Sequence, residues 1–136
     1  MPIVTTIEGR IAQVAIDRPE KRNTLSSELC KDLAREFLEL NDDTRVRSIV
    51  LCGHNNVFCA GLDIEEQLAE NTPIFNEFQK VIDALDALSK PVVAAVSGPA
   101  VSQGAAMLYH CDLVFAGEHA LFSMPGLALG QTPVTA

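Results

Sequence analysis

Apolar residues in the first third of the chain follow two different periods. Residues 3–7 and 11–16 are rich in isoleucine and valine and flank a glycine-containing turn, which is typical of two short strands. Within residues 27–40, leucine and phenylalanine recur every three or four positions, so this segment is predicted to be an amphipathic helix. Ser26 is the predicted N-cap, and Glu28 places a negative charge in the first turn, where the helix dipole favours it.

The rest of the chain alternates buried runs with helical patterns. Residues 48–52 and 91–96 are nearly unbroken apolar runs, as expected for strands covered on both faces of a parallel sheet. Between them, a helix is predicted that begins at Thr72-Pro73 and stops before the second run. A short helix over 102–110 and a strand over 112–116 follow. This alternation predicts an α/β fold with crossover connections.

Two segments show neither period. Residues 97–100 (SGPA) are predicted to be a turn, and residues 122–136 show no helix or strand pattern. A chain of 136 residues is long enough for one domain with a modest core. Because the last segment contains no closing element, residues 1–136 are interpreted as one incomplete domain, a fragment or truncated version of a larger fold.

Composition and charge narrow the possible partners. Apolar residues make up 48% and charged residues 21%, which is typical of a globular protein. Ten basic and eighteen acidic residues give a net charge of −8, which argues against a general binder of nucleic acid or of anionic membranes. All ten lysines and arginines lie at or before Lys90, so an anionic ligand would need a local basic cluster or backbone N–H groups.

Cysteine spacing and the apolar runs indicate the compartment. The four cysteines show no pattern typical of a metal site, so no metal is expected. The first ten residues lack the profile of a signal peptide, and runs such as 91–96 are too short to cross a bilayer. We therefore expect a reduced, cytoplasmic protein without membrane contact.

Two strand-to-helix turns are built from small residues. Ala60-Gly61 follows one apolar run, and their small size would let a ligand approach the main chain near the N–H of Leu62. GPAVSQGAA (98–106) follows the other run and opens a helix, where free N–H groups cluster. Two such groups converging would form an oxyanion hole, in which one donor is typically worth about 3–4 kcal/mol of barrier. From spacing alone, glycine after a buried strand is also ordinary turn chemistry.

Four motifs occur in order along the chain: RPEKRNTLS (18–26), NVFCAGLDI (56–64), KPVVAAVSGPAVSQGAA (90–106) and HCDLVFA (110–116). Together they resemble the crotonase superfamily, the enoyl-CoA hydratase/isomerase family, and in style its isomerase-like branch. The resemblance covers essentially the whole chain but only about the N-terminal half of such a protein. It implies an α/β fold of ββα repeats forming a spiral, truncated before the C-terminal helical region.

The resemblance also implies a ligand and the residues that bind it. The backbone N–H groups of Leu62 and Gln103 would form the oxyanion hole for the enolate of an acyl-CoA thioester. Coenzyme A enters as part of the substrate, and no separate cofactor is implied. Family members are commonly trimers or dimers of trimers, so a homo-oligomer (trimer or hexamer) is expected if the complete fold is present. The positions that the resemblance places against substrate and coenzyme A are Lys21, Arg22, Leu25, Ala60, Gly61, Asp63, Ile64 and Gly104.

The sequence departs from the family pattern at the acids that transfer protons. Hydratases of the family carry glutamates at the positions matching Ala106 and Gly126, and isomerase-like members carry one at the position matching Val134. None of these is a carboxylate here. Proton transfer at carbon usually needs a carboxylate within hydrogen-bond reach, so both standard mechanisms are disfavoured.

Several other side chains could take part in chemistry, but each has a simpler structural explanation. A solvated helix face would account for the acids Asp63, Glu65 and Glu66. Burial as a small apolar residue would account for Cys59, for which His54 is the nearby partner.

The remaining candidates also have structural explanations. Adjacent residues do not face one another, so helix termination and core packing explain His110-Cys111-Asp112. Ser102 has no placed histidine or aspartate partner. Phe75, Phe78 and Val81 are at helical spacing, which fits packing in the core.

Two functions therefore compete. The first is an acyl-CoA enzyme of the isomerase or hydratase type that acts through a stabilised thioester enolate. The second is an acyl-CoA-binding or oligomerisation module that has lost its acids. A serine-type hydrolase using Ser102 is a distant third hypothesis. The intact turns favour the first for the ligand, and the missing carboxylates favour the second for the chemistry.

Overall fold

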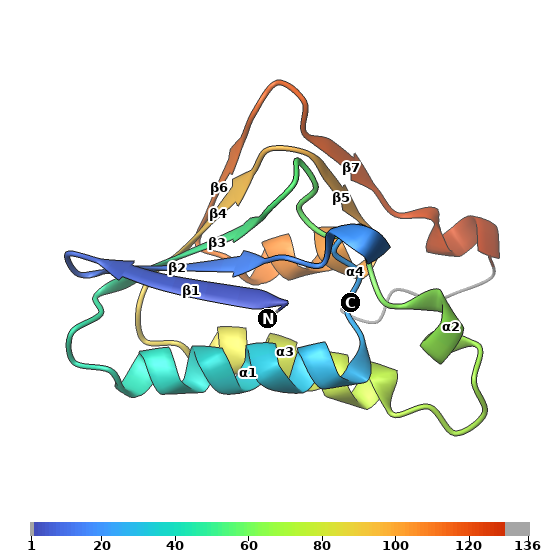
Figure 1. The fold of residues 1–136 in the computed structure, drawn as a ribbon, viewed down its shortest axis with the longest axis horizontal. Helices are drawn as coiled ribbons and strands as arrows, with labels where there is room; N and C mark the ends of the chain where they lie inside the picture. The colour runs from blue at the N-terminus through green and yellow to red at the C-terminus, as the bar shows by residue number, and fades with distance from the viewer. Residues whose placement is uncertain (1, 130–136) are drawn as a thin grey trace.

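The computed structural model describes residues 2–129 and places five strands in one sheet (Figure 1). The first two strands form an antiparallel hairpin, and each later strand is parallel to its neighbour. This arrangement confirms the hairpin and the α/β crossovers predicted from the sequence. In sheet order the strands are β1 (Ile3–Glu8), β2 (Ile11–Ile16), β3 (Ser48–Gly53), β4 (Val92–Val96) and β6 (Leu113–Ala116).

A second, smaller sheet follows where β4 and β6 end. β5 (Pro99–Val101) and β7 (Leu121–Ser123) are parallel neighbours in it. Figure 1 shows the chain turning sharply after β4 and again after β6, so that β5 and β7 run down the other side of the turn. Successive strand, strand and helix units therefore wind around one another, as the predicted ββα repeats require.

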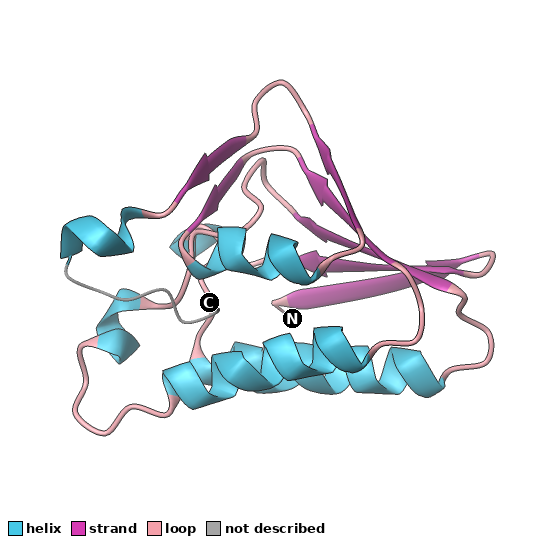
Figure 2. Ribbon diagram, turned by 180° about the vertical axis from the view of Figure 1, so that it is seen from behind, coloured by secondary structure: helices cyan, strands magenta, loops and turns pink. Residues whose placement is uncertain are grey.

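Two long helices cover one side of the large sheet. α1 (Ser27–Asp42) and α3 (Ile74–Ala87) lie side by side in both views (Figures 1 and 2). The Ser26 side chain accepts a hydrogen bond from the N–H of Leu29, which confirms the predicted N-cap. Their apolar faces contribute to the core, in which Phe37 and Phe78 are fully buried.

Short helices occupy the remaining connections and position the loops described below. Each comprises three to five residues. They are η1 (Pro19–Lys21), α2 (Ile64–Gln67), α4 (Gln103–Ala106), η2 (Met107–His110) and η3 (Pro125–Leu129), where η denotes a 3-10 helix.

Two predictions about irregular segments are wrong in part, whereas the short helix over 102–110 is confirmed: the chain is helical from 103 to 110, with α4 continued by the 3-10 helix η2. Residues 97–100 are not only a turn, because Pro99 and Ala100 begin β5. Residues 122–129 include part of β7 and all of η3, whereas 130–136 lie outside the described residues. Both missed strands are three residues long, too short for a period-two pattern to emerge.

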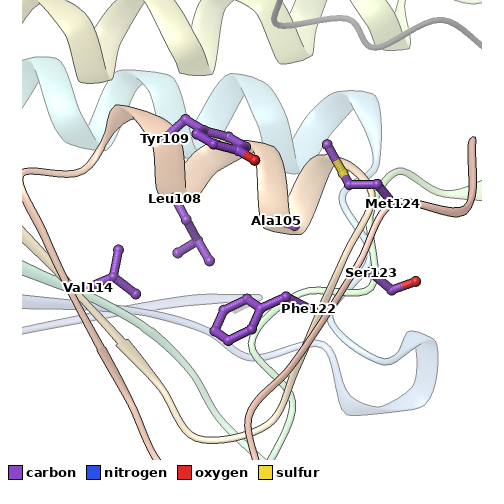
Figure 3. A pocket seen from close by; sticks show the side chains of 7 residues that line it. All are labelled: Ala105, Leu108, Tyr109, Val114, Phe122, Ser123 and Met124. Carbon is purple, nitrogen blue, oxygen red and sulfur yellow. The ribbon is translucent and has the colours of Figure 1, made fainter.

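An apolar surface surrounds β6, the last strand of the large sheet. Leu113 and Phe115 are 58% and 65% exposed, although apolar parallel strands are usually covered on both faces. A cavity of about 390 Å³ lies beside it, and Figure 3 shows Leu108, Val114 and Phe122 pointing into the same space. The lining is apolar apart from Tyr109 and Ser123, so this surface suits burial better than chemistry.

The helices within residues 2–129 are all too short or too polar to cross a membrane. In the same part of the chain, no three His, Cys, Asp or Glu side chains gather closely enough to hold a metal ion.

Candidate functional site

A cleft of about 520 Å³ lies between the two small-residue turns. One wall comes from the loop after β3, from α2 and from the start of α3, and the other comes from the segment that joins β5 to α4. One turn follows β3 of the large sheet and the other follows β5 of the small sheet, each at the carboxyl end of its strand, where ligands generally bind in open α/β sheets. The residues that line the cleft are Ala60, Leu62, Ile64, Gln67, Leu68, Phe75, Val101, Ser102, Gln103 and Pro125.

One main-chain N–H in the loop 59–63 has no hydrogen-bond acceptor among the described residues. It is the N–H of Leu62, a residue that is only 2% exposed. A buried N–H without a partner is rare, so this group is available to a ligand. The other four N–H groups are occupied: Cys59 donates to Pro99 O (3.2 Å), Ala60 to Arg22 O (3.2 Å), Gly61 to Cys59 Sγ (3.4 Å) and Asp63 to Leu25 O (2.8 Å).

The neighbouring hydrogen bond from Leu25 sets the direction of this N–H. Leu25 N–H donates to Gly61 O at 2.8 Å, and Leu25 also forms an isolated parallel bridge with Leu62. The Gly61 carbonyl and the Leu62 N–H belong to one planar trans peptide, in which the two groups point in opposite directions. The Leu62 N–H is therefore directed away from Leu25.

A second N–H without an acceptor in residues 2–129 belongs to Gln103. Gln103 is the first residue of α4, so its N–H has no partner within the helix. In the same peptide, Ser102 O accepts from Ala106 N–H at 2.9 Å and points along the helix. Peptide planarity then directs the Gln103 N–H outward from the start of the helix.

Gly61 lets the two turns approach each other. Its φ of +102° is a conformation that residues with side chains rarely adopt. A Cβ added there would lie 3.2 Å from Val101 O and 3.3 Å from Ser102 Cβ, and only 3.4 Å from Gln103 Oε1. The main chains of the two turns are thus in near contact, and the Gln103 side chain lies beside Gly61.

The cleft contains no carboxylate among the residues that the structure describes. The positions matching the hydratase glutamates are Ala106, which is buried, and Gly126 in η3, whereas Val134 lies outside the described range. The polar side chains that line the cleft are Gln67, Ser102 and Gln103. None of these three is an ordinary general base at neutral pH.

The nearby acids Asp63, Glu65 and Glu66 do not form one solvated face, which corrects that interpretation for two of them. Only Glu65 is solvated, with a side chain that is 83% exposed. The Glu66 carboxylate accepts hydrogen bonds from the backbone N–H and the hydroxyl of Ser27. Asp63 is 6% exposed and caps α2 by accepting from the N–H groups of Glu65 and Glu66.

The residues expected to contact coenzyme A fall into exposed and buried groups. Arg22 and Ile64 are exposed, and Lys21 forms an ion pair with Glu65 at 3.3 Å. Leu25 is fully buried and acts through its backbone hydrogen bonds. Gly104 is buried too, and no side chain fits there, since a Cβ would lie 2.1 Å from the Cys59 carbonyl oxygen. Among the described residues, the Arg22 guanidinium has no hydrogen-bond or ion-pair partner.

Apolar side chains form the rim of the cleft. Ile64 and Leu68 are 66% and 81% exposed, so large aliphatic side chains are presented at its edge. Phe75 also lines the cleft, so the expectation that it packs in the core is wrong. It lies one position off the buried stripe of α3, to which Phe78 and Val81 do belong.

Cys59 is not an activated nucleophile. Cys59 is fully buried, and burial raises the pKa of its thiol to about 12, which confirms its role as a small core residue. His54 instead places Nδ1 3.5 Å from Asp17 Oδ2.

The His110-Cys111-Asp112 run does not converge on one point. His110 Nδ1 lies 2.7 Å from Asp86 Oδ1, whereas Asp112 accepts from the N–H of Val92 at 2.7 Å. Burial raises the pKa of Cys111 to about 12. The expectation that this run ends a helix and packs is therefore confirmed.

Asn23 contributes to the site in a way that the sequence did not indicate. Its Nδ2 donates to His54 O and Val57 O at 3.0 and 2.8 Å, and its Oδ1 accepts from Arg18 N–H at 2.8 Å. These bonds hold the loop after β2 against the loop after β3. The sequence showed only an asparagine in a polar loop, a residue type that tolerates the left-handed backbone seen here (φ +59°), and its partners are distant in sequence.

Ser102 adopts a backbone conformation that favours glycine, with φ +52° and ψ −120°. We expect Ser102→Gly to stabilise the chain by about 1 kcal/mol, because it relieves strain that typically costs about 1–3 kcal/mol. Urea denaturation measures the change. Asn71→Gly is the matched control, since asparagine at φ +56° tolerates its conformation and should gain less than about 0.5 kcal/mol. Equal gains at both positions would contradict the assignment of strain to Ser102.

Comparison with known proteins identifies the family. The family model described as enoyl-CoA hydratase/isomerase matches residues 6–136. The chain is 35% identical to the short-chain-enoyl-CoA hydratase of Clostridium acetobutylicum over 96% of its own length and 52% of that protein. It is 32% identical to the 2,3-dehydroadipyl-CoA hydratase of Escherichia coli, with coverages of 96% and 52%.

Solved structures support the same assignment. An enoyl-CoA hydratase/isomerase from Pseudoalteromonas atlantica superposes with a TM-score of 0.89 at 33% identity, covering 98% of this chain and 53% of that one. The chain thus spans about half the length of the relatives it matches. With a family model that matches nearly all of its residues, the chain belongs to the enoyl-CoA hydratase/isomerase family.

Proposed function

We propose that this chain binds an acyl-CoA thioester in the cleft and holds its carbonyl oxygen between the N–H groups of Leu62 and Gln103. The observation that carries the proposal is that these two N–H groups, both without acceptors in residues 2–129, belong to residues that line one cleft. Hydrogen bonds from both would stabilise the negative charge that develops on the oxygen as the thioester becomes an enolate. One such donor typically lowers the barrier by about 3–4 kcal/mol.

The reaction that this arrangement supports best is hydration or double-bond migration in an enoyl-CoA. Both reactions pass through charge on the thioester oxygen, so one pair of donors serves either. The relatives' names agree on the class, since those of Clostridium acetobutylicum and Escherichia coli are hydratases of CoA thioesters. The exposed apolar rim around Ile64, Leu68 and Phe75 would cover the pantetheine arm or the acyl chain.

One observation favours a second function, acyl-CoA binding without turnover. No carboxylate lines the cleft among the described residues, so no ordinary general base is in place there. Isothermal titration calorimetry with a saturated acyl-CoA, together with assays of hydration and of 3-to-2 double-bond migration on a short enoyl-CoA, separates the functions. Turnover supports the enzyme, binding alone supports the module, and the absence of binding contradicts both.

The exposed cation Arg22 is proposed to contact the phosphates of coenzyme A. Its carbonyl accepts from Ala60 N–H, so it lies beside the cleft loop, and its guanidinium has no partner in residues 2–129. We expect Arg22→Gln to weaken acyl-CoA binding about fivefold and to reduce its salt dependence. Calorimetry at low and high salt measures both effects.

Arg47→Gln is the matched control for Arg22→Gln. Arg47 is an exposed arginine just before β3, at the opposite end of this strand from the cleft loop. It should leave the affinity unchanged. Equal losses in the two variants would show a general effect of net charge and contradict a local contact.

A further inference from the structure

Asp63, the residue after the Leu62 donor, is a buried carboxylate with both oxygens engaged. Oδ2 lies 3.1 Å from Arg18 Nη1, and the two side chains are only 8% and 19% exposed. Oδ1 accepts from the N–H groups of Glu65 and Glu66 at 3.0 and 3.5 Å. A charge buried to this extent depends on its partner, because alone it would lose its solvation without compensation.

Arg18 joins this carboxylate to the loop after β2. The same Nη1 that reaches Asp63 also donates to Thr24 O at 3.1 Å. The backbone N–H of Arg18 donates to Asn23 Oδ1, which holds the start of the loop in place. One guanidinium thus contacts the residue before Leu25 and the residue after Leu62.

Leu25 and the Gly61–Leu62 peptide lie next to the two residues that Arg18 contacts. Leu25 N–H donates to Gly61 O, and Leu25 O accepts from Asp63 N–H, both at 2.8 Å. These bonds determine where the Leu62 N–H points, as the planar peptide requires. A change that loosens Thr24 or Asp63 would therefore let this peptide rotate.

We propose that Arg18 is a positioning residue for the oxyanion hole, acting through Asp63 and Thr24 on the direction of the Leu62 N–H. This inference rests on the proposed function. Arg18 is not among the residues that line the cleft, so it has no assigned contact with the ligand. Its effect should fall on the polarisation of the thioester carbonyl rather than on the affinity for coenzyme A. Where turnover is measured, misplacing one donor should lower kcat by up to about 10²-fold.

Infrared spectroscopy of a bound acyl-CoA, labelled with ¹³C at the thioester carbonyl, tests the inference. Two hydrogen bonds should move the carbonyl band of the bound ligand to lower frequency than in water. In Arg18→Met the band should return toward the water value, while the affinity for coenzyme A without an acyl group changes less than about threefold. Asp63→Asn provides a second variant, because asparagine still caps α2 but cannot form the ion pair.

Arg45→Met is the matched control. It removes another Arg–Asp pair, in which Arg45 Nη2 lies 2.7 Å from Asp43 Oδ2. This pair lies at the surface and precedes β3. This variant should leave the carbonyl band unchanged.

The possible results separate the two levels of the argument. No band shift in the unaltered chain would overturn the proposed function, and this inference with it. A shift in the unaltered chain that persists in both Arg18→Met and Asp63→Asn would overturn the inference alone. If Arg18→Met does not fold, the band in Asp63→Asn decides.

Discussion

Replacing Gly104 by alanine is expected to destabilise the chain by about 3 kcal/mol, at the upper end of overpacking effects. The new Cβ would lie 2.1 Å from the carbonyl oxygen of Cys59 and 2.9 Å from its Cβ. That carbonyl cannot retreat easily, because it accepts from Val101 N–H at 2.9 Å while Cys59 N–H donates to Pro99 O. Relief must come from moving α4 away from the loop, which separates Gln103 from Leu62.

Urea denaturation of Gly104→Ala measures the loss of stability, and acyl-CoA calorimetry under folding conditions measures the damage to the cleft. Gly117→Ala is the control, since its nearest neighbour, Val96 O, would be 3.7 Å from the added Cβ. That variant should change the free energy of unfolding by less than about 0.5 kcal/mol. A Gly104→Ala chain as stable as Gly117→Ala would show that α4 and the loop are not in firm contact.

The fold could be predicted where a pattern extends over at least five residues. The strand over 11–16 and the helix over 27–40 have enough positions for their periods to emerge, and both occur within two residues of the predicted bounds. β5 and β7 have three residues each and are strands because they pair with each other. Phe75 could not be placed for a related reason. Helical spacing does not decide whether a residue at the edge of the buried face of α3 packs in the core or lines the cleft.

The candidate site was predictable from motifs only at its centre. The resemblance indicated Leu62 and Gln103, and the structure brings both to one cleft. The contacts that hold the cleft together join residues from separate motifs, such as Arg18 with Asp63 and Asn23 with Val57. No local pattern relates such pairs, because their proximity results from how the ββα repeats pack.

The most direct test of the proposed oxyanion hole removes the N–H of Gln103. Gln103→Pro deletes the donor at the first position of α4, which proline favours. Because a residue before proline prefers extended backbone and Ser102 lies at φ +52° and ψ −120°, the folding of this variant is checked first. If the hole forms as proposed, any enoyl-CoA turnover should fall about 10²- to 10³-fold, and the carbonyl band of a bound thioester should return toward its value in water. The affinity for coenzyme A should fall much less, since its phosphates bind elsewhere.

Gln103→Ala separates the N–H from the side chain, because it removes the carboxamide beside Gly61 and keeps the donor. It should retain the band shift that Gln103→Pro loses. If proline disturbs folding, replacing the Ser102–Gln103 amide by an ester removes the same hydrogen without a ring. A band that shifts as far in the ester as in the unaltered chain would mean that the thioester oxygen does not bind this N–H. Loss of the shift in Gln103→Ala alone would instead assign the contact to the carboxamide, which lies close enough to Gly61 to compete for the same position.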